Sequence, residues 1–403
     1  MAAIAMREIE GRSRGWWALF ALGAALLGAM LFAWHAMESR GHVITGMTNQ
    51  VVWGLPHVFA VFLILAASGV LNVASVASAF GKGFYKPLAP LSGWLAIVLL
   101  AGGLAVLGLD LGRSDRLVVA LTHFNFKSIF AWNMFLYSGF FAIVGVYLWT
   151  MLDRTAGGYS SAAGRLAFVW RLVLTTGTGS IFGFLIAREA YASALLAPTF
   201  IVLSIVYGMA IYLLALIAVC AGTGRPLGRG VIERIGRLLG WFVLAGLYFV
   251  AVFHLTNLYL ARQIGVERFL LVDGGIYTWL FWAGQVLAGS VLPLILLWSP
   301  ATRGRRGATV LAAVLIVLGG LAQMYVTVIG AQAWPLDLFP GYEMRSSFFD
   351  GVIHPYAPSL PETALAFGGF AIALLGALLG VKFLRLLPES LADEALDPGA
   401  GAY

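Results

Sequence analysis

The stretch LTHFNFKSIFAW, residues 121–132, places a histidine, an amide, an ammonium group and a hydroxyl directly before an apolar run. These polar members are His123, Asn125, Lys127 and Ser128. Ionisable and polar groups are costly beside lipid, so those found there are functional candidates by default. We therefore take His123, Asn125 and Ser128 as candidates for binding a polar ligand or moving a proton.

A second set of polar residues lies at similar depth in other apolar runs. His57 comes ~10 Å into the second run at about 1.5 Å rise per residue, and Trp53 precedes it by one helical turn. Asp110 closes the third run, and Trp132 and Asn133 lie early in the fourth. A histidine and a carboxylate can exchange protons near neutral pH. The combination suits a quinone headgroup, although a proton or ion carrier would use similar residues.

The composition indicates that all these residues sit in a membrane protein. The 403 residues are 61% hydrophobic and 11% charged, with a mean hydropathy of +0.91. A soluble core does not need that much apolar surface. Cys220 is the only cysteine, so the chain cannot build an iron–sulfur cluster from its own thiolates. The net charge of +7 is more simply explained by membrane topology than by nucleic acid, which we do not expect as a partner.

Ten apolar runs are long enough to span a bilayer, which needs about 20 residues per helix. They predict an all-α integral membrane protein with one domain over residues 16–386, an N-terminal tail over 1–15 and a C-terminal tail over 387–403. The ten expected spans are 16–36, 51–79, 88–109, 127–151, 166–187, 198–222, 239–262, 274–298, 309–331 and 361–386.

Lysine and arginine are concentrated on one set of loops and on both tails. Cytoplasmic loops carry the excess of these residues, so both termini are expected in the cytoplasm. In a bacterial inner membrane the histidines and amides would then lie near the periplasmic face. The loop over about 332–360 would also be periplasmic, and we expect it to be a docking surface for a partner.

Several motifs carry a family resemblance over about residues 45–388. They are VVWGLPHVFAVFLILAASG, LGLDLGR, HFNFKSIF and the long stretch WPLDLFPGYEMRSSFFDGVIHPYAPSLPETALAFGG. They resemble the NrfD/PsrC family of quinone-reactive membrane subunits. The similarity is to its ten-span branch, which includes HybB-type hydrogenase subunits and the DsrP subunit of the Dsr sulfur-metabolism complex. Within that branch, WGLPHVFA looks more like DsrP.

The resemblance implies a fold of two four-helix bundles with peripheral helices. It also implies a bound quinone, either menaquinone or ubiquinone, with no haem or iron–sulfur cluster in this chain. Electrons would pass between that quinone and a periplasmic ferredoxin-like iron–sulfur subunit. In a Dsr-type complex, a c-type cytochrome and further redox subunits would be present as well.

The resemblance also implies roles for the candidate residues. His57 or His123 would hydrogen-bond the quinone and take or give a proton, while Asp110 orients a histidine or relays the proton outward. Asn125 and Asn133 would steady the headgroup. The remaining members of the expected site are Trp53, Ser128 and Trp132, and no residue is expected to bind a metal.

Three other functions remain open from the residues alone. A transporter or proton channel would work without electron transfer, but the polar groups gather on one side, which favours the quinone site. A cytochrome b anchor needs histidines that face each other across helices, and His57 and His254 lie at similar depths. A passive anchor would hold redox subunits to the membrane without contacting quinone.

Overall fold

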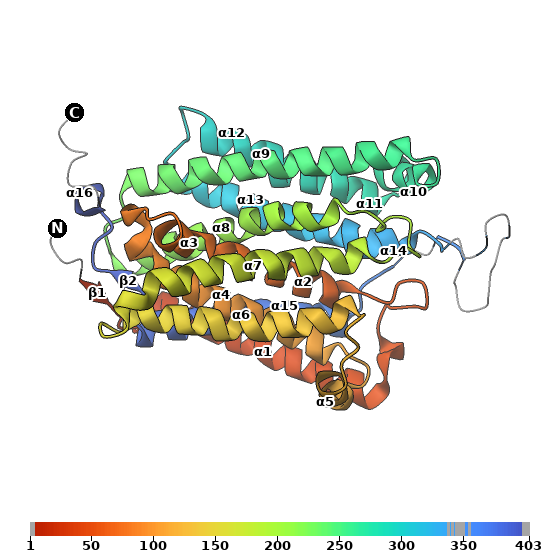
Figure 1. Ribbon diagram of the computed structural model, residues 1–403, viewed down its shortest axis with the longest axis horizontal. Coiled ribbons are helices and arrows are strands. Elements are labelled where there is room, and N and C mark those ends of the chain that lie inside the picture. The colour runs from red at the N-terminus through yellow and green to blue at the C-terminus, as the bar shows by residue number, and fades with distance from the viewer. Residues whose placement is uncertain (1–4, 337–338, 340–341, 343–350, 354–355, 397–403) are drawn as a thin grey trace.

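The computed structural model describes residues 5–336, 339, 342, 351–353 and 356–396. These residues form a bundle of long helices with one very short β ribbon (Figure 1). Ten of the helices are long and apolar enough to cross a membrane, which confirms the all-α, ten-span prediction. They are Arg14–Arg40, Leu55–Ser78, Gly83–Leu109, Ile129–Leu152, Gly157–Gly183, Leu196–Thr223, Arg229–Tyr259, Ile276–Trp298, Arg306–Ala333 and Leu360–Phe383.

Six of these spans are centred on one continuous α-helix each, and the others are divided. The continuous helices are α1 (Arg14–Arg40), α6 (Ile129–Leu152), α7 (Ser160–Gly183), α8 (Leu196–Thr223), α9 (Arg229–Tyr259) and α15 (Leu360–Phe383). The divided spans contain α2 (Leu55–Val70) with α3 (Asn72–Ser78), η2 (Gly83–Leu88) with α4 (Ala89–Leu109), α11 (Ile276–Trp279) with η6 (Leu280–Val291) and α12 (Leu292–Trp298), and α13 (Arg306–Tyr325) with η7 (Val326–Gly330) and α14 (Ala331–Ala333).

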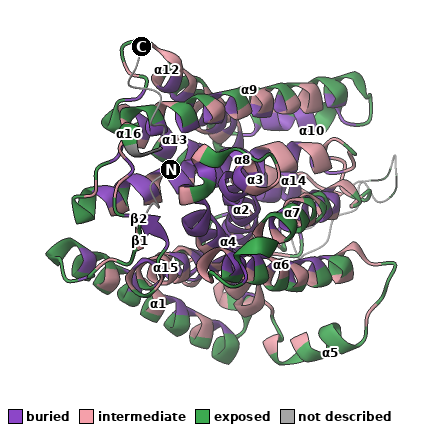
Figure 2. Ribbon diagram, turned by 60° about the vertical axis from the view of Figure 1, so that its left-hand side comes forward, coloured by how far each residue is buried: buried purple, intermediate pink, exposed green. Residues whose placement is uncertain are grey.

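The spans pack as two bundles that share a central contact. In the first bundle, α2 packs on α4, α6 packs on α7, and α4 joins the two pairs. In the second, α8 packs on α9 and α13, and α13 packs on η6 and α12. The central α2 and α8 are largely buried, whereas α1 and α9 expose apolar side chains as lipid-facing helices do (Figure 2). Outside the bundles, α15 packs on α4, and α1 packs on α15.

Glycines allow α2 and α8 to approach each other closely at the bundle junction. A Cβ atom added to Gly69 would collide with the backbone of Ser204, and one added to Gly208 would collide with the backbone of Val70. In lipid the hydrophobic effect does not drive helices together, so their association relies on close packing, which small residues permit. The contact between the two bundles therefore depends on this glycine pair.

Three spans depart from regular helix in ways that the sequence analysis did not predict. The second span breaks at Leu71, where the Ser92 hydroxyl donates to Val70 O (2.7 Å) and accepts from Ala74 N (3.2 Å). The eighth and ninth contain the π-helical segments η6 and η7. Pro293, which has no N–H to donate, follows η6. Such π segments are rare and frequently lie at functional sites.

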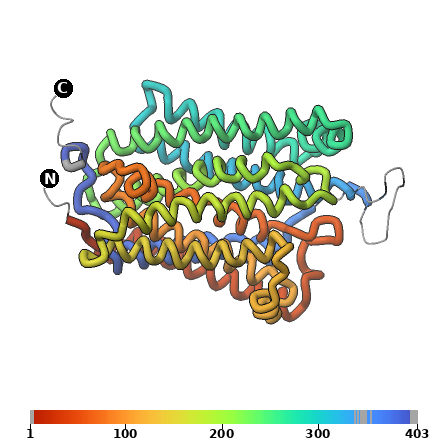
Figure 3. The backbone as a smooth tube through the Cα atoms, in the orientation of Figure 1, coloured from red at the N-terminus to blue at the C-terminus, as the bar shows by residue number. Residues whose placement is uncertain are grey.

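The two ends of the bundle differ in construction (Figure 3). At one end, β1 (Met6–Arg7) pairs antiparallel with β2 (Leu387–Pro388), and the Arg225 guanidinium donates to carbonyls of both strands. We call this the ribbon end, and α16 (Asp393–Leu396) lies beside it. The opposite, distal end carries the short helices η1 (His42–Ile44), η3 (Ser114–Arg116), α5 (Leu117–Thr122) and α10 (Ile264–Arg268).

The ends of the bundle bear on the expected topology. Both ends of the described chain meet at the ribbon end, as an even number of spans requires. The placement of that end in the cytoplasm stays a prediction from the basic loops. Within the expected docking loop, 332–360, residues 337–338, 340–341, 343–350 and 354–355 lie outside the described residues, and its docking role stays a prediction.

The glycine contact between the bundles generates the first prediction. Gly208→Ala should destabilise the protein by about 1–3 kcal/mol, because its methyl group has no space beside the Val70 backbone. Gly145→Ala on α6 is the matched control, since a Cβ there meets nothing within 4 Å. Thermal unfolding of the purified variants in detergent measures the difference. Equal midpoints for the two variants would show that α2 and α8 do not pack as described.

Candidate functional site

A histidine and a carboxylate from different spans meet at the distal end. His57 is the third residue of α2, and Asp110 is the C-cap residue of α4. Nδ1 of His57 lies 2.8 Å from Oδ2 of Asp110. The Asp110 side chain is fully buried, whereas the His57 side chain keeps 17% of its surface exposed. The packing of α2 on α4 thus joins two residues that the sequence analysis named separately.

This ion pair leaves hydrogen-bonding capacity unused. His57 Nδ1 and both carboxylate oxygens of Asp110 are buried, and none has a well-directed hydrogen bond to the described protein. Buried polar atoms are almost always satisfied by protein, water or a ligand. The pair is therefore suited to a ligand that offers a hydroxyl or a carbonyl group.

An aromatic wall lies beside the pair. The Trp53 ring stacks on the His57 imidazole with centroids 5.9 Å apart and planes 18° apart. Phe182 contacts the same indole edge-on at 5.8 Å, and Phe130 contacts it at 6.2 Å. A flat ring could pack against this wall through dispersion and offset stacking.

A further histidine, His42, approaches Asp110 from the other side. Its Nε2 lies 3.1 Å from the Asp110 backbone carbonyl and 4.0 Å from Oδ1. The sequence analysis did not single out His42. It precedes the second span in a short η1 helix, and its sequence gives no signal that it would fold onto the end of α4. Asp110 therefore sits between two imidazoles.

Gln332, at the end of the ninth span, holds the segment that leads into α2. Its Oε1 accepts hydrogen bonds from the backbone N–H groups of Val52 and Trp53, both at 3.0 Å. Its Nε2 donates to the carbonyls of Trp53 (3.0 Å) and Val328 (2.7 Å). The fully buried amide thereby fixes the backbone of Trp53 on both sides.

Gln50 and Arg188 extend this contact. Gln50 Nε2 donates to the carbonyls of Gln332 (3.0 Å) and Trp334 (2.8 Å). Arg188 Nη2 donates to Gln50 O at 2.8 Å, and its Nη1 donates to Gln332 O at 3.3 Å. We call Gln50, Arg188 and Gln332 the amide clamp, because they join three spans through the backbone of the segment before α2.

A buried carboxylate supports the same segment from the tenth span. Glu362 Oε2 accepts from Gly46 N (2.6 Å) and Ser359 N (2.8 Å). Its Oε1 accepts from the Tyr356 hydroxyl (2.6 Å), which in turn accepts from Leu55 N (2.7 Å), the first residue of α2. Ser359 and Glu362 also form a capping box at the start of α15.

The candidate residues before the fourth span, His123, Asn125 and Ser128, make no contact with the His57–Asp110 pair. His123 and Asn125 are exposed after α5, where Nδ1 of His123 bonds the Thr122 hydroxyl (3.0 Å) and Oδ1 of Asn125 accepts from Lys127 N (3.0 Å). Ser128 is the N-cap residue of α6. The structure shows no contact between these residues and the His57–Asp110 pair, so the expected cluster falls into separate groups.

The two remaining candidates on α6 make contacts of different kinds. Asn133 is buried, and its Nδ2 donates to the carbonyls of Ile129 (2.9 Å) and Gly177 (3.1 Å), which joins α6 to α7. Trp132 is 48% exposed, and its indole N–H donates to Phe126 O at 2.9 Å. Neither contacts His57 or Asp110 in the structure.

A second histidine–carboxylate pair lies in the second bundle. Nδ1 of His254 lies 2.6 Å from Oε2 of Glu267, whose Oε1 accepts from Asn257 Nδ2 at 2.7 Å. The Glu267 side chain is 1% exposed. Each of the histidines His57 and His254 therefore faces a carboxylate of its own bundle rather than the other histidine. Among the described residues, no group of three or more His, Cys, Asp or Glu side chains could hold a metal ion.

The family of the chain follows from its match to a family model. The model described as "Polysulphide reductase, NrfD" matches residues 43–335, which include most of the spans and the His57–Asp110 pair. The chain belongs to the NrfD family. The resemblance drawn from the sequence motifs is confirmed at this level.

Two relatives show how far the similarity extends. The Hdr-like menaquinol oxidoreductase integral membrane subunit of Archaeoglobus fulgidus is 29% identical over 98% of this chain and 100% of its own length. A selenate reductase subunit of Mesobacillus selenatarsenatis is 23% identical over 84% of this chain and 86% of its own length. The similarity to both therefore covers the membrane domain as a whole rather than a single motif.

The Glu362 contacts generate the second prediction. Glu362→Gln should destabilise the protein by about 1–3 kcal/mol, because an amide keeps the shape but directs N–H groups at donors that need an acceptor. Glu389→Gln is the control, since its side chain is 54% exposed in a surface pair with Arg7. Thermal unfolding of both variants measures the effect. A Glu362→Gln variant as stable as the Glu389→Gln variant would contradict the role assigned to this carboxylate.

Proposed function

We propose that this chain is the quinone-binding membrane subunit of a multi-subunit oxidoreductase in the cytoplasmic membrane. The observation that carries the proposal is the buried His57–Asp110 pair, whose unsatisfied atoms lie beside the Trp53 ring. Membership of the NrfD family and the menaquinol oxidoreductase named among the relatives support it. Menaquinone is therefore our first choice of quinone, and ubiquinone is the second.

The residues at the pair fit a quinone headgroup. A quinone supplies two-electron redox chemistry, in which each ring oxygen exchanges one proton. His57 is placed to hydrogen-bond one ring oxygen and to accept or donate its proton, because an imidazole nitrogen can act as an acceptor or, when protonated, as a donor. Asp110 stabilises the imidazolium form of His57 by its negative charge at 2.8 Å. Trp53 and Phe182 supply the apolar surface on which the ring would pack.

His42 provides a route for the proton away from His57. It lies on the opposite side of the Asp110 carboxylate, and its side chain is 27% exposed. A proton released at His57 could pass along the Asp110 carboxylate to His42 and reach the distal surface. The amide clamp holds the backbone from Gln50 to Trp53, which is the segment that leads to His57.

The partner that exchanges electrons with the quinone must bring its own redox centre. Cys220 is the only thiol in the sequence, and it is buried within α8. A ferredoxin-like iron–sulfur subunit docked at the distal end would lie nearest to the His57–Asp110 pair. With the predicted orientation this partner is periplasmic, as in a DsrP-type complex. A HybB-type hydrogenase is the alternative assembly.

The carboxylate gives the third prediction. Asp110→Asn should lower quinone-linked turnover of the purified complex by about 10²-fold or more, because the neutral amide no longer stabilises protonated His57. Asp115→Asn is the matched control, since Asp115 is also at the distal end but pairs with Arg113 on the surface. Turnover is measured with a soluble quinol analogue as the varied substrate. Unchanged turnover in Asp110→Asn would favour a passive membrane anchor.

The partner gives the fourth prediction. Mild detergent extraction from native membranes should recover the chain with an iron–sulfur subunit and bound quinone, identified by mass spectrometry. Sulfur-pathway subunits or a c-type cytochrome would support the DsrP-type assembly, and hydrogenase subunits would support the HybB-type assembly. A solitary chain without quinone would overturn the proposal and favour a transporter.

A further inference from the structure

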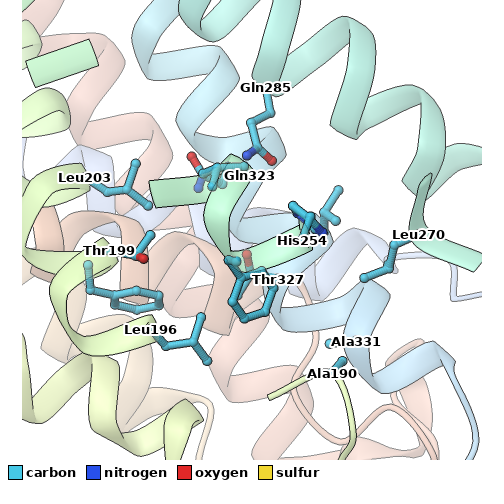
Figure 4. A pocket seen from close by; sticks show the side chains of 14 residues that line it. Ala190, Leu196, Thr199, Leu203, His254, Leu270, Gln285, Gln323, Thr327 and Ala331 are labelled. Atoms are coloured by element: carbon cyan, nitrogen blue, oxygen red, sulfur yellow. The ribbon is translucent and has the colours of Figure 1, made fainter. Parts of the chain in front are cut away.

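A largely apolar cavity that also contains a few polar side chains lies within the second bundle, away from the His57–Asp110 pair. It has a volume of about 40 Å³ and is bounded by α8, α9, α13 and the π segments η6 and η7. Figure 4 shows the side chains of His254, Gln285, Gln323 and Thr327 around it. A second cavity of about 20 Å³ continues it and shares Gln285 and Gln323 as lining residues.

The cavity is suited to water. The side-chain amide of Gln285 makes no hydrogen bond to any other described residue, although the residue is buried, with only 5% of its surface exposed. Gln323 Oε1 accepts from the Tyr207 hydroxyl (2.7 Å), and no acceptor among the described residues receives its amide N–H groups. A buried water needs about 10–15 Å³ and two to four polar partners. The two cavities therefore have the room for water and, in these amides, polar partners for it.

The His254–Glu267 pair adjoins the larger cavity, because His254 is one of its lining residues. Nδ1 of His254 is committed to Glu267, so Nε2 is the ring atom left for the cavity. Asn257 and His254 together satisfy both oxygens of the nearly fully buried carboxylate. Phe281 packs edge-to-face on the imidazole at 4.8 Å and restricts its rotation. The imidazole is thus held by Glu267 on one side and borders the cavity on the other.

The residues of α9 that line the two small cavities are spread along the helix. They extend along α9 from His254 to Val243, which is about 16 Å at 1.5 Å per residue. The hydrocarbon core of a bilayer is about 30 Å thick. Three π-helical segments border this space, namely η5 (Phe269–Asp273), η6 and η7. Toward the ribbon end the bundle is closed by buried apolar residues such as Ile235, Leu239 and Ile316.

We propose that the second bundle contains a hydrated proton-binding site. The His254–Glu267 pair binds a proton at Nε2 of His254 and exchanges it with water in the adjoining cavity. Uptake converts the neutral imidazole into an imidazolium held by the Glu267 carboxylate, and release returns the same proton to the water. The inference goes beyond the proposed quinone function and does not depend on it.

Other titratable groups around the pair are engaged elsewhere. Arg262 pairs with Glu189 at 3.1 Å on the connection between α9 and α10, and Arg268 pairs with Asp273 at 2.7 Å after α10. Tyr277, on α11, packs against Phe269 and Tyr325. Arg188, on the connection before α8, belongs to the amide clamp. Within the described part of the chain, His254 and Glu267 therefore form the ionisable pair that borders this cavity.

The test uses infrared difference spectra of the full chain in detergent, recorded as the pH is stepped between about 5 and 8, where imidazoles titrate. The spectra are recorded in an Asp110→Asn background, which removes the carboxylate of the His57–Asp110 pair. This background should still show an imidazole change coupled to a change in a carboxylate band. In this background His254→Gln should lose the coupled signal, and Glu267→Gln should lose its carboxylate component. His35→Gln is the matched control, because His35 is exposed on α1, and it should keep the coupled signal.

The water is tested separately. Gln285→Leu leaves His254 and Glu267 in place but removes an amide from the cavity, so deuterium exchange at the coupled signal should slow at least several-fold. Size-exclusion profiles and unfolding midpoints identify variants that fail to fold. A coupled signal that persists when His254→Gln is combined with Asp110→Asn would overturn the proton site. Unchanged exchange in Gln285→Leu would overturn its connection to the cavity water.

Discussion

The site depends on the need of buried backbone groups for hydrogen-bond partners. The segment before α2 is irregular, so its N–H and C=O groups cannot bond within a helix, and water is scarce around them. Gln332 and Glu362, from the last two spans, supply those partners to Val52, Trp53 and Gly46. Because the same segment places Trp53 and the start of α2, residues about 300 positions away in the sequence fix the position of His57.

Each bundle carries one histidine against one buried carboxylate, but the two pairs are built for different surroundings. The Asp110 oxygens lack well-directed partners, and Trp53 stacks on the paired His57, which leaves capacity for a ligand. The Glu267 oxygens are both satisfied, and the unused capacity lies on the water side of His254. A quinone ring fits the first arrangement and a hydrated proton fits the second. Gly69 and Gly208 bring the helices of the two bundles together.

Local patterns predicted the spans well and the site only in part. Apolar length defines a membrane helix, so all ten spans could be placed from the sequence. Ser359 and Glu362 have the spacing of a capping box, but their local pattern does not reveal the bonds to Gly46 and Tyr356. Glu267 lies outside the apolar run that contains His254, so its pairing depends on how α10 folds back. The break at Leu71 and the π segments depend on tertiary contacts and have no clear local signal.

The most direct test of the quinone site is photoaffinity labelling of the intact complex with an azido-quinone, followed by peptide mapping. The account predicts labelling within residues 42–57 or next to Asp110, and excess unlabelled quinone should compete it away. Labelling confined to the second bundle around His254, or labelling that quinone does not compete, would contradict the assignment of the His57–Asp110 pair as the quinone site.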